Sequence, residues 1–226
     1  MNKYDIAVFD MDGTIMDTLE DLTNAVNEIL RQHHLPLQTG RSVRSFLGNG
    51  ARRLIELSVP AGTDEQTIET YIREFLAQYQ LHCEDHTRPY EGIVPLLHTL
   101  RSRGIRTAVV SNKADAAVQK LCAAWFPDCF DYAAGEIAGI PRKPAADPVL
   151  RAVEALGGAG NAVYIGDSEV DVMTAENARM DLIAVSWGFR DRDVLMDLGV
   201  SRIADTPAQL LELLTGRTLE KPAEEA

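Results

Sequence analysis

Residues 9–14 read Phe-Asp-Met-Asp-Gly-Thr, and they end a short apolar run, Ile-Ala-Val-Phe, at residues 6–9. An uninterrupted apolar run of this length predicts a strand that is buried on both faces, as in a parallel sheet. Ligand sites in open parallel sheets lie beyond the carboxyl ends of the strands, which is where Asp10 and Asp12 would stand. Gly13 then permits a sharp turn. We therefore expect functional acids here, although Asp-Gly is also a common turn signal.

The rest of the chain divides into a helical stretch and an alternating stretch. Strands are predicted at 106–110, 132–134, 162–165, 182–185 and 201–204, with helices at 93–103, 114–125, 149–156, 172–179, 191–198 and 208–214. This alternation predicts an α/β fold with a doubly wound parallel sheet. In residues 17–87, by contrast, apolar residues recur at helical spacing in successive segments, so this stretch reads as all helical. We predict a core formed by 1–16 and 88–226, an inserted helical cap formed by 17–87, and a ligand crevice between them.

The composition limits the possible partners. The chain has 226 residues and a formal net charge of −12, without a run of Lys or Arg, which argues against binding to nucleic acid or to an anionic membrane. No apolar run approaches the length of a membrane span, and no signal peptide precedes the first strand. Cys83, Cys122 and Cys129 are sparse and lack metal-site spacing, which fits a reducing compartment. We expect a cytoplasmic protein.

Polar residues suited to a single reaction follow several of the predicted strands. They are Asp10 and Asp12 after the first strand, Ser111 and Asn112 after the second, Lys143 in a later loop, and Asp167 and Asp171 after the strand at 162–165. Carboxylates from two strand ends would form an all-oxygen site suited to Mg²⁺. Lys143 and the Ser111 hydroxyl could hold a phosphoryl group. Asp10 would then be free to attack phosphorus, and Asp12 could give and take a proton.

Each of these residues also has a simpler explanation. Ser111 and Asn112 could form the N-cap of the helix that follows them. Lys143 could be an exposed loop lysine, and Asp167 could stabilise the start of a helix. Their joint occurrence at strand ends, in this order along the chain, favours the catalytic interpretation.

The motifs D-x-D-G-T, S-N-K, K-P and G-D-S-x-x-D resemble, in this order, the four motifs of the haloacid dehalogenase-like hydrolase superfamily. The resemblance spans nearly the whole chain, and the helical insertion resembles the C1 cap of that superfamily. It implies an aspartyl-phosphate mechanism with Mg²⁺. In the implied site Asp10 is the nucleophile and a metal ligand, and Asp12 is the general acid and base with its carbonyl on the metal. Thr14 lies beside the site and belongs, with Ser111, Asn112 and Lys143, to the residues that hold the phosphate. Asp167 is the second metal ligand, and Asp171 lies farther out at the metal site.

The resemblance also narrows the chemistry. Dehalogenases of this superfamily lack an acid at the position of Asp12, because expelling a halide needs no proton, so this chain resembles the phosphatases. Segments 47–51, 88–92, 139–144 and 186–189 look like the phosphoglycolate phosphatase branch. The implied substrate is a small phosphorylated metabolite, with 2-phosphoglycolate first. A pyrophosphatase, a sugar phosphatase, a nucleotidase, a phosphosugar mutase and a silent binding protein of the same fold stay open.

Substrate choice would depend mainly on the cap. The turn Gly48-Asn49-Gly50 could bring backbone N–H groups close to a substrate carboxylate, or it could be a plain turn between helices. Arg44, Arg52 and Arg53 could each offer a bidentate contact to a carboxylate, although helix arginines are more often solvated. We expect the cap to open and close on its links at 15–18 and 86–92.

Overall fold

The computed structural model describes residues 2–158 and 160–216. Its main sheet has six described strands in the order β5-β4-β1-β6-β7-β8, and every neighbouring pair is parallel. The strands are β1 (Ile6–Phe9), β4 (Arg106–Ala114), β5 (Tyr132–Glu136), β6 (Ala162–Gly166), β7 (Asp181–Val185) and β8 (Ile203–Ala204). This topology confirms the predicted α/β fold with a parallel sheet.

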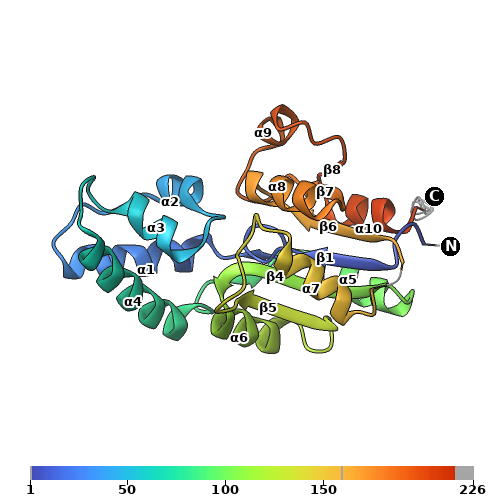
Figure 1. Cartoon of the computed structure of the whole chain (residues 1–226), viewed down its shortest axis with the longest axis horizontal. Coiled ribbons are helices and arrows are strands. Elements are labelled where there is room, and N and C mark those ends of the chain that lie inside the picture. Colours follow the sequence, from blue (N-terminus) through green and yellow to red (C-terminus); the bar gives the residue numbers. More distant parts are fainter. Residues whose placement is uncertain (1, 159, 217–226) are drawn as a thin grey trace, which may run out of the picture.

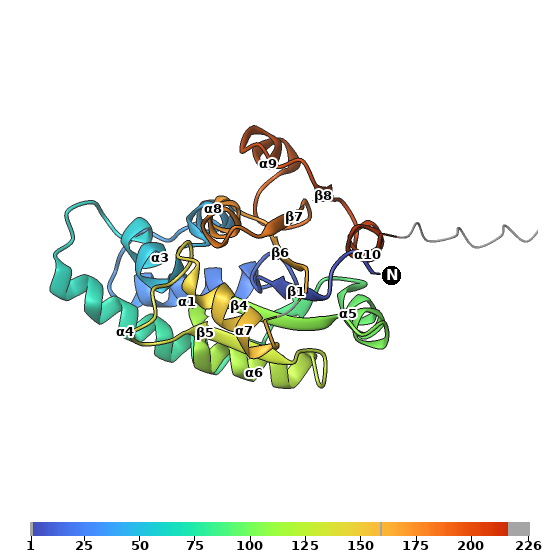
Figure 2. The same cartoon turned by 45° about the vertical axis from the view of Figure 1, so that its right-hand side comes forward.

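Helices cover both faces of this sheet, and alternate residues of β1 show how. Ala7 and Phe9 belong to one buried cluster, whereas Ile6 and Val8 belong to another, as the period of two in a strand requires. The first cluster takes in α5 (Ile93–Ser102), α6 (Asp115–Trp125) and α10 (Pro207–Thr215), and the second takes in α7 (Asp147–Ala155) and α8 (Glu169–Ala178). The short helix α9 (Arg192–Asp197) lies at the periphery (Figure 2). The sheet is therefore doubly wound, and its strands are apolar on both sides.

Four helices are inserted between β2 (Met16–Asp17) and β3 (Arg88–Pro89), which pair with each other antiparallel. They are α1 (Leu19–Gln32), α2 (Gly40–Phe46), α3 (Gly50–Ser58) and α4 (Glu65–His82). Figure 1 shows them as a separate lobe beyond the carboxyl end of β1. The inserted helical region is thus confirmed, while the exact domain limits 1–16, 17–87 and 88–226 stay a prediction, the last of them running beyond the described residues.

Some boundaries differ from those predicted, and the differences matter for the site. Asp17 lies in a strand and not in the helical stretch, because a pair of two-residue strands is too short to leave a periodic signal. β4 extends past Val110 to Ala114 with an irregular register. Ala114 is therefore the N-cap of α6, so the alternative in which Ser111 and Asn112 form this cap is wrong.

The structure also describes the cysteines and the lengths of the helices. Cys83, Cys122 and Cys129 are free thiols, and burial raises the pKa of Cys122 to about 12. Burial likewise holds the pKa values of Cys83 and Cys129 above their ordinary value. Within residues 2–158 and 160–216, no helix has both the length and the hydropathy needed to cross a membrane.

Candidate active site

Three adjacent strands bring the predicted site residues to one edge of the sheet. β1 lies between β4 and β6, and Phe9 is in register with Val109 on one side and Ile165 on the other. The residues that follow these positions therefore emerge together, since parallel strands end on the same side. Asp10, Ser111 and Asp167 are all buried there.

Lys143 also reaches this edge, although it comes from a loop. Its Nζ lies 2.8 Å from Asp10 Oδ1 and 3.0 Å from Asp171 Oδ1, and it donates to the Tyr164 hydroxyl at 2.7 Å. Burial alone would lower the pKa of Lys143, but Asp10 and Asp171 outweigh this and raise it. Lys143 is thus a buried, charged lysine and not an exposed loop residue.

Asp10, Asp167 and Asp171 form a buried acidic cluster in which one carboxylate oxygen from each residue lies within 4.8 Å of the other two. Burial raises the pKa of Asp10 to about 7, with Lys143 acting against it and Asp171 adding to it. Burial and the neighbouring acids hold the pKa of Asp167 well above its ordinary value. The cluster therefore has more negative charge than Lys143 balances, and its donors are all oxygen. This combination fits a Mg²⁺ site.

The loops that follow β1 and β7 both bind the Asp167 carboxylate. Thr14 Oγ1 donates to Asp167 Oδ1 at 2.9 Å, and the Phe189 backbone N–H donates to Oδ2 at 2.7 Å. Gly13 has a φ of +81°, and a Cβ built on it would lie 2.4 Å from Asp167 Oδ2. Glycine at this position is required by the close approach of the loop to the acid.

Asp171 fixes the start of α8 and supports Lys143 at the same time. Its Oδ2 accepts from the backbone N–H groups of Asp167 and Ser168, at 3.1 Å each, and from Ser168 Oγ at 2.8 Å. Its Oδ1 accepts from Lys143 and from the Tyr164 hydroxyl. Ser168 and Asp171 form a capping box, so Ser168 and not Asp167 is the N-cap of α8.

Asp12 is paired with a lysine that the sequence interpretation did not assign to the site. Lys113 Nζ donates to Asp12 Oδ1 at 2.7 Å and lies 4.5 Å from the centre of the Tyr79 ring. Lys113 and Tyr79 are both buried. The available signal was that Lys113 directly follows Asn112 in the S-N-K motif. Tyr79 and Tyr164 gave no signal, because each occupies a regular position in an apolar pattern.

A cavity of about 60 Å³ opens beside these residues, between the sheet edge and the inserted helices. Its lining includes Asp10, Asp12, Ser111, Asn112, Lys113 and Asp167 from the core and Leu22, Gly48, Gly50, Leu54, Phe75, Leu76 and Tyr79 from the helical region. Asn112 Nδ2 bridges the two parts, donating to Gly48 O at 3.1 Å and to Lys143 O at 2.8 Å.

Asn49 and Arg52 are not among the described residues that line the cavity. Arg52 instead pairs with Glu65, at 2.8 Å, and with Glu69. Arg53 pairs with Glu56. The structure therefore brings Gly48 and Gly50 to the site and leaves the arginines of α3 in contact with glutamates.

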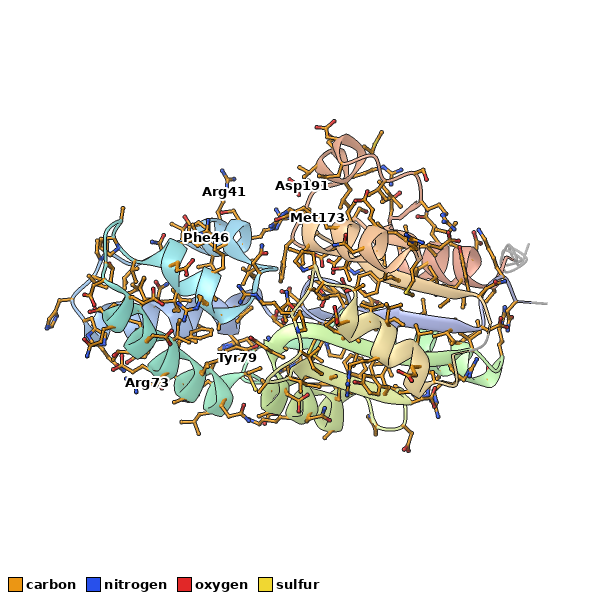
Figure 3. All side chains as sticks on the ribbon, in the orientation of Figure 1. Arg41, Phe46, Arg73, Tyr79, Met173 and Asp191 are labelled. Atoms are coloured by element: carbon orange, nitrogen blue, oxygen red, sulfur yellow. The ribbon has the colours of Figure 1, made fainter. Side chains whose placement is uncertain are left out.

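Two arginines fasten α2 to the core loop that follows β7. Arg44 Nη2 donates to Gly188 O and to Asp191 Oδ1, at 2.9 Å each. Arg190 donates to the backbone carbonyls of Arg44 and Leu47, at 3.1 Å each. Figure 3 shows Asp191 at this border, facing the end of the lobe that carries α2. These contacts hold the turn at Gly48 against the core.

Comparison with known proteins places this geometry in a family. The family model for the haloacid dehalogenase-like hydrolases matches residues 7–185. The chain is 33% identical, over 215 residues, to a phosphoglycolate phosphatase of Caulobacter vibrioides, covering 92% of this chain and 91% of that one. It is 31% identical, over 216 residues, to an N-acetylmuramic acid 6-phosphate phosphatase of Pseudomonas aeruginosa, covering 92% and 93% of the two chains.

Solved structures agree with the sequence relatives. A protein of Lactobacillus delbrueckii subsp. bulgaricus, described as a candidate phosphoglycolate phosphatase, superposes with a TM-score of 0.90 at 38% identity. The match covers 96% of this chain and 100% of that one. The superposition covers the parallel sheet and the helical insertion together, and this chain belongs to the haloacid dehalogenase-like hydrolase family.

Proposed function

We propose that the protein is a Mg²⁺-dependent phosphatase that hydrolyses a small phosphate monoester, with 2-phosphoglycolate as the preferred substrate. The observation that carries this proposal is the position of Asp10, which lies against Lys143 at 2.8 Å and within the acidic cluster with Asp167 and Asp171. A buried carboxylate between a fixed cation and a metal site is suited to attack phosphorus.

In the first half of the reaction the Asp10 carboxylate attacks phosphorus, the phosphorus–oxygen bond of the ester breaks, and an aspartyl-phosphate forms. Asp12 gives a proton to the departing alkoxide. The Lys143 ammonium, the Ser111 hydroxyl and the backbone N–H of Asn112 bind the phosphoryl oxygens. Thr14 acts on the site through its hydrogen bond to Asp167.

In the second half Asp12, now a carboxylate, takes a proton from a water molecule that attacks the aspartyl-phosphate. Free phosphate leaves and Asp10 is regenerated. The side chains of Asp10 and Asp167 and the carbonyl of Asp12 would hold Mg²⁺, with Asp171 farther out, and the ion would neutralise charge on the phosphoryl group.

The small size of the cavity supports a small substrate. At about 60 Å³ it offers the space of a few water molecules with the helical region in this position. The relatives alone leave the choice open, because a phosphoglycolate phosphatase and an N-acetylmuramic acid 6-phosphate phosphatase are similar to this chain at 33% and 31% identity. Pyrophosphate, sugar phosphates and nucleotides are the alternative substrates of the same site.

The test is phosphate release from a panel of esters that includes 2-phosphoglycolate, N-acetylmuramic acid 6-phosphate, glucose 6-phosphate, pyrophosphate and a nucleoside monophosphate. The panel is run with Mg²⁺, with a chelator, and with Asp10→Asn. We expect strong preference for 2-phosphoglycolate that disappears in both controls. Preference for another ester would keep the mechanism and replace the substrate. Formation of an isomeric sugar phosphate in place of free phosphate would indicate a mutase. Folded protein that hydrolyses none of these compounds would contradict the proposal.

A further inference from the structure

The ammonium group of Lys113 lies in the wall of the cavity, directly beside Asp12, and not all of its N–H groups are used by the contacts described above. Lys113 Nζ donates one hydrogen bond to Asp12 Oδ1 at 2.7 Å, and it lies over the Tyr79 ring, 4.5 Å from the ring centre. An ammonium group has three N–H donors, and the ring face accounts for at most one more. Lys113 can therefore donate to a further group in the cavity.

Tyr79 supplies a second donor from the inserted helices. Its hydroxyl is buried and, apart from its proximity to Lys113, has no hydrogen-bond partner among the described residues. Leaving such a group unpaired costs about 1–3 kcal/mol, so its position in the wall of the cavity needs a reason. Tyr79 lines the cavity, and Figure 3 places it where the lobe of inserted helices meets the core. Because Lys113 lies against Tyr79, a ligand group that bonds to Lys113 would come next to this hydroxyl and could accept from it.

The surroundings of these two donors suit a small anion. Leu22, Leu54, Phe75 and Leu76 form an apolar wall, which strengthens any charge interaction inside it. Of the described residues that line the cavity, Lys113 is the only cation, and the acids Asp10, Asp12 and Asp167 also line it.

We propose that Lys113 and Tyr79 bind a carboxylate on the leaving group, so that the preferred substrates are phosphate monoesters of short 2-hydroxy acids. This inference rests on the proposed phosphatase function, because it assumes that Asp12 acts at the ester oxygen. Lys113 bonds to Asp12, so a group that also bonds to Lys113 must lie next to that oxygen. In the ester of a 2-hydroxy acid the carboxylate is attached to the carbon that carries the ester oxygen. A carboxylate farther along the chain, or a neutral leaving group, would miss the pair.

Lys113 could instead serve only to orient Asp12, and substrate pairs separate the two roles. The probes are 2-phosphoglycolate, its neutral analogue 2-hydroxyethyl phosphate, and 3-phosphooxypropanoate, whose carboxylate is one carbon farther away. We expect wild-type kcat/KM for 2-phosphoglycolate to exceed that for both other esters by about a hundred-fold, since a buried polar site rejects a ligand that leaves it unpaired.

Substitutions then assign this preference to the two residues. Tyr79→Phe should lower the ratio of kcat/KM for 2-phosphoglycolate to kcat/KM for the other two esters about ten-fold, because it removes one hydrogen bond to a charged group. Lys113→Met should reduce this ratio to a few-fold. Tyr71→Phe is the control, because it removes a hydroxyl from the same helix outside the cavity lining, and it should leave the ratio unchanged. An equal fall for all three esters in both Lys113→Met and Tyr79→Phe would overturn the inference. So would a wild-type enzyme that hydrolyses the neutral analogue as well as the acid.

A binding measurement keeps the test independent of turnover and of misfolding. In protein that carries Asp10→Asn, calorimetry with 2-phosphoglycolate and Mg²⁺ should show a Kd about ten-fold weaker when Tyr79→Phe is added, with unchanged thermal unfolding. No change in Kd would overturn the role of Tyr79. If the wild-type enzyme hydrolyses no monoester at all, the proposed function fails first and this inference falls with it. If it hydrolyses monoesters without an acid preference, the phosphatase mechanism stands, but this inference fails and so does the choice of 2-phosphoglycolate as the preferred substrate.

Discussion

Gly13 and Asp167 show how closely single residues are fitted at the site. The backbone of Gly13 has a φ of +81°, and an added Cβ would meet the Asp167 carboxylate at 2.4 Å. The acid cannot move away freely, because Thr14 and the Phe189 N–H both bind it. Backbone conformation and side-chain packing therefore both demand glycine here.

We predict that Gly13→Ala loses activity and Mg²⁺ affinity, and Gly62→Ala is the matched control. Gly62 also has a positive φ, +89°, but nothing lies within 4 Å of its added Cβ. Both substitutions should lower the free energy of unfolding by about 1–2 kcal/mol through the left-handed backbone. Only Gly13→Ala should also displace Asp167, which a Mg²⁺ titration of phosphate release would detect. Equal Mg²⁺ dependence in the two variants would contradict the steric argument.

At the same scale, some site residues were predictable from sequence and others were not. Asp10 and Asp167 were predictable, because each directly follows a strand that shows in the sequence as an apolar run. Lys113 was not, since a lysine after a strand is most often an exposed charge. Its burial depends on Tyr79, which arrives from α4, and no local pattern reports a contact between segments so far apart in the chain. Arg52 has the chemistry of a carboxylate ligand, yet Glu65 and Glu69 are close enough to pair with it.

Among the elements, the helices and strands were predictable to within a few residues, apart from the weakest. The strand Ile6–Phe9 has the predicted bounds, because an apolar run flanked by polar residues marks both ends. β4 runs four residues longer than its apolar part, since Ser111–Ala114 stay extended to resume pairing with β5 at Glu136. That extension is what carries Asn112 and Lys113 to the cavity.

The two ends of the helical insertion are tied together by Asp21, near the start of α1. Its carboxylate accepts from the backbone N–H of His86 at 3.0 Å and from that of Thr87 at 2.8 Å, and it also contacts the His86 ring at 2.9 Å. Burial alone would raise the pKa of Asp21, but the hydrogen bonds from Thr87 and His86 outweigh it and hold the pKa below its ordinary value. The ionised carboxylate therefore stabilises the fold.

This gives a prediction for stability against pH. Because the pKa of Asp21 is lower in the folded chain than in the unfolded one, its contribution is complete above about pH 4 and is lost as the pH falls through the folded value. At pH 5, Asp21→Ala should lower the free energy of unfolding by about 1.5–3 kcal/mol, and the difference from wild type should shrink towards pH 3. Asp21 raises the pKa of His86, so His86 stays protonated throughout this range.

Denaturant unfolding at pH 5 and pH 3 measures this effect, and Glu28→Ala on the same helix is the control. Glu28 belongs to a surface pair with Arg31, so its removal should change the free energy by no more than about 0.5 kcal/mol. A difference between wild type and Asp21→Ala that stays constant from pH 5 to pH 3 would show that the acid contributes through packing and not through charge.

For the whole molecule, the position of the helical lobe against the core decides what the site can bind. Arg44 of the lobe donates a hydrogen bond to the core, and Arg190 of the core donates one to the lobe. Asn112 of the core also donates to the lobe, at the Gly48 carbonyl. The cavity exists because the lobe is held in this position, and its walls come from both sides. Sequence patterns predicted the lobe but not its contacts with the core, because most of these contacts use backbone carbonyls, which no residue type marks.

The electrostatics of the whole site lead to a last prediction, on the effect of the metal ion on global stability. Asp10 and Asp167 are buried with raised pKa values, so the folded chain without a cation holds acids that are costly to ionise. A Mg²⁺ ion that binds only the folded state stabilises it by mass action, by about 2.7 kcal/mol at a hundred times its Kd.

Wild-type protein should therefore unfold at a higher temperature in MgCl₂ than in EDTA. Asp167→Asn should remove most of that difference, because it removes a ligand. It should also raise the melting temperature in EDTA, because a neutral amide replaces a buried acid that is costly to ionise. Scanning calorimetry of both proteins at matched ionic strength measures this. An equal Mg²⁺ shift in the two proteins would mean that the ion acts through general charge screening of a chain with a net charge of −12, and not at the cluster.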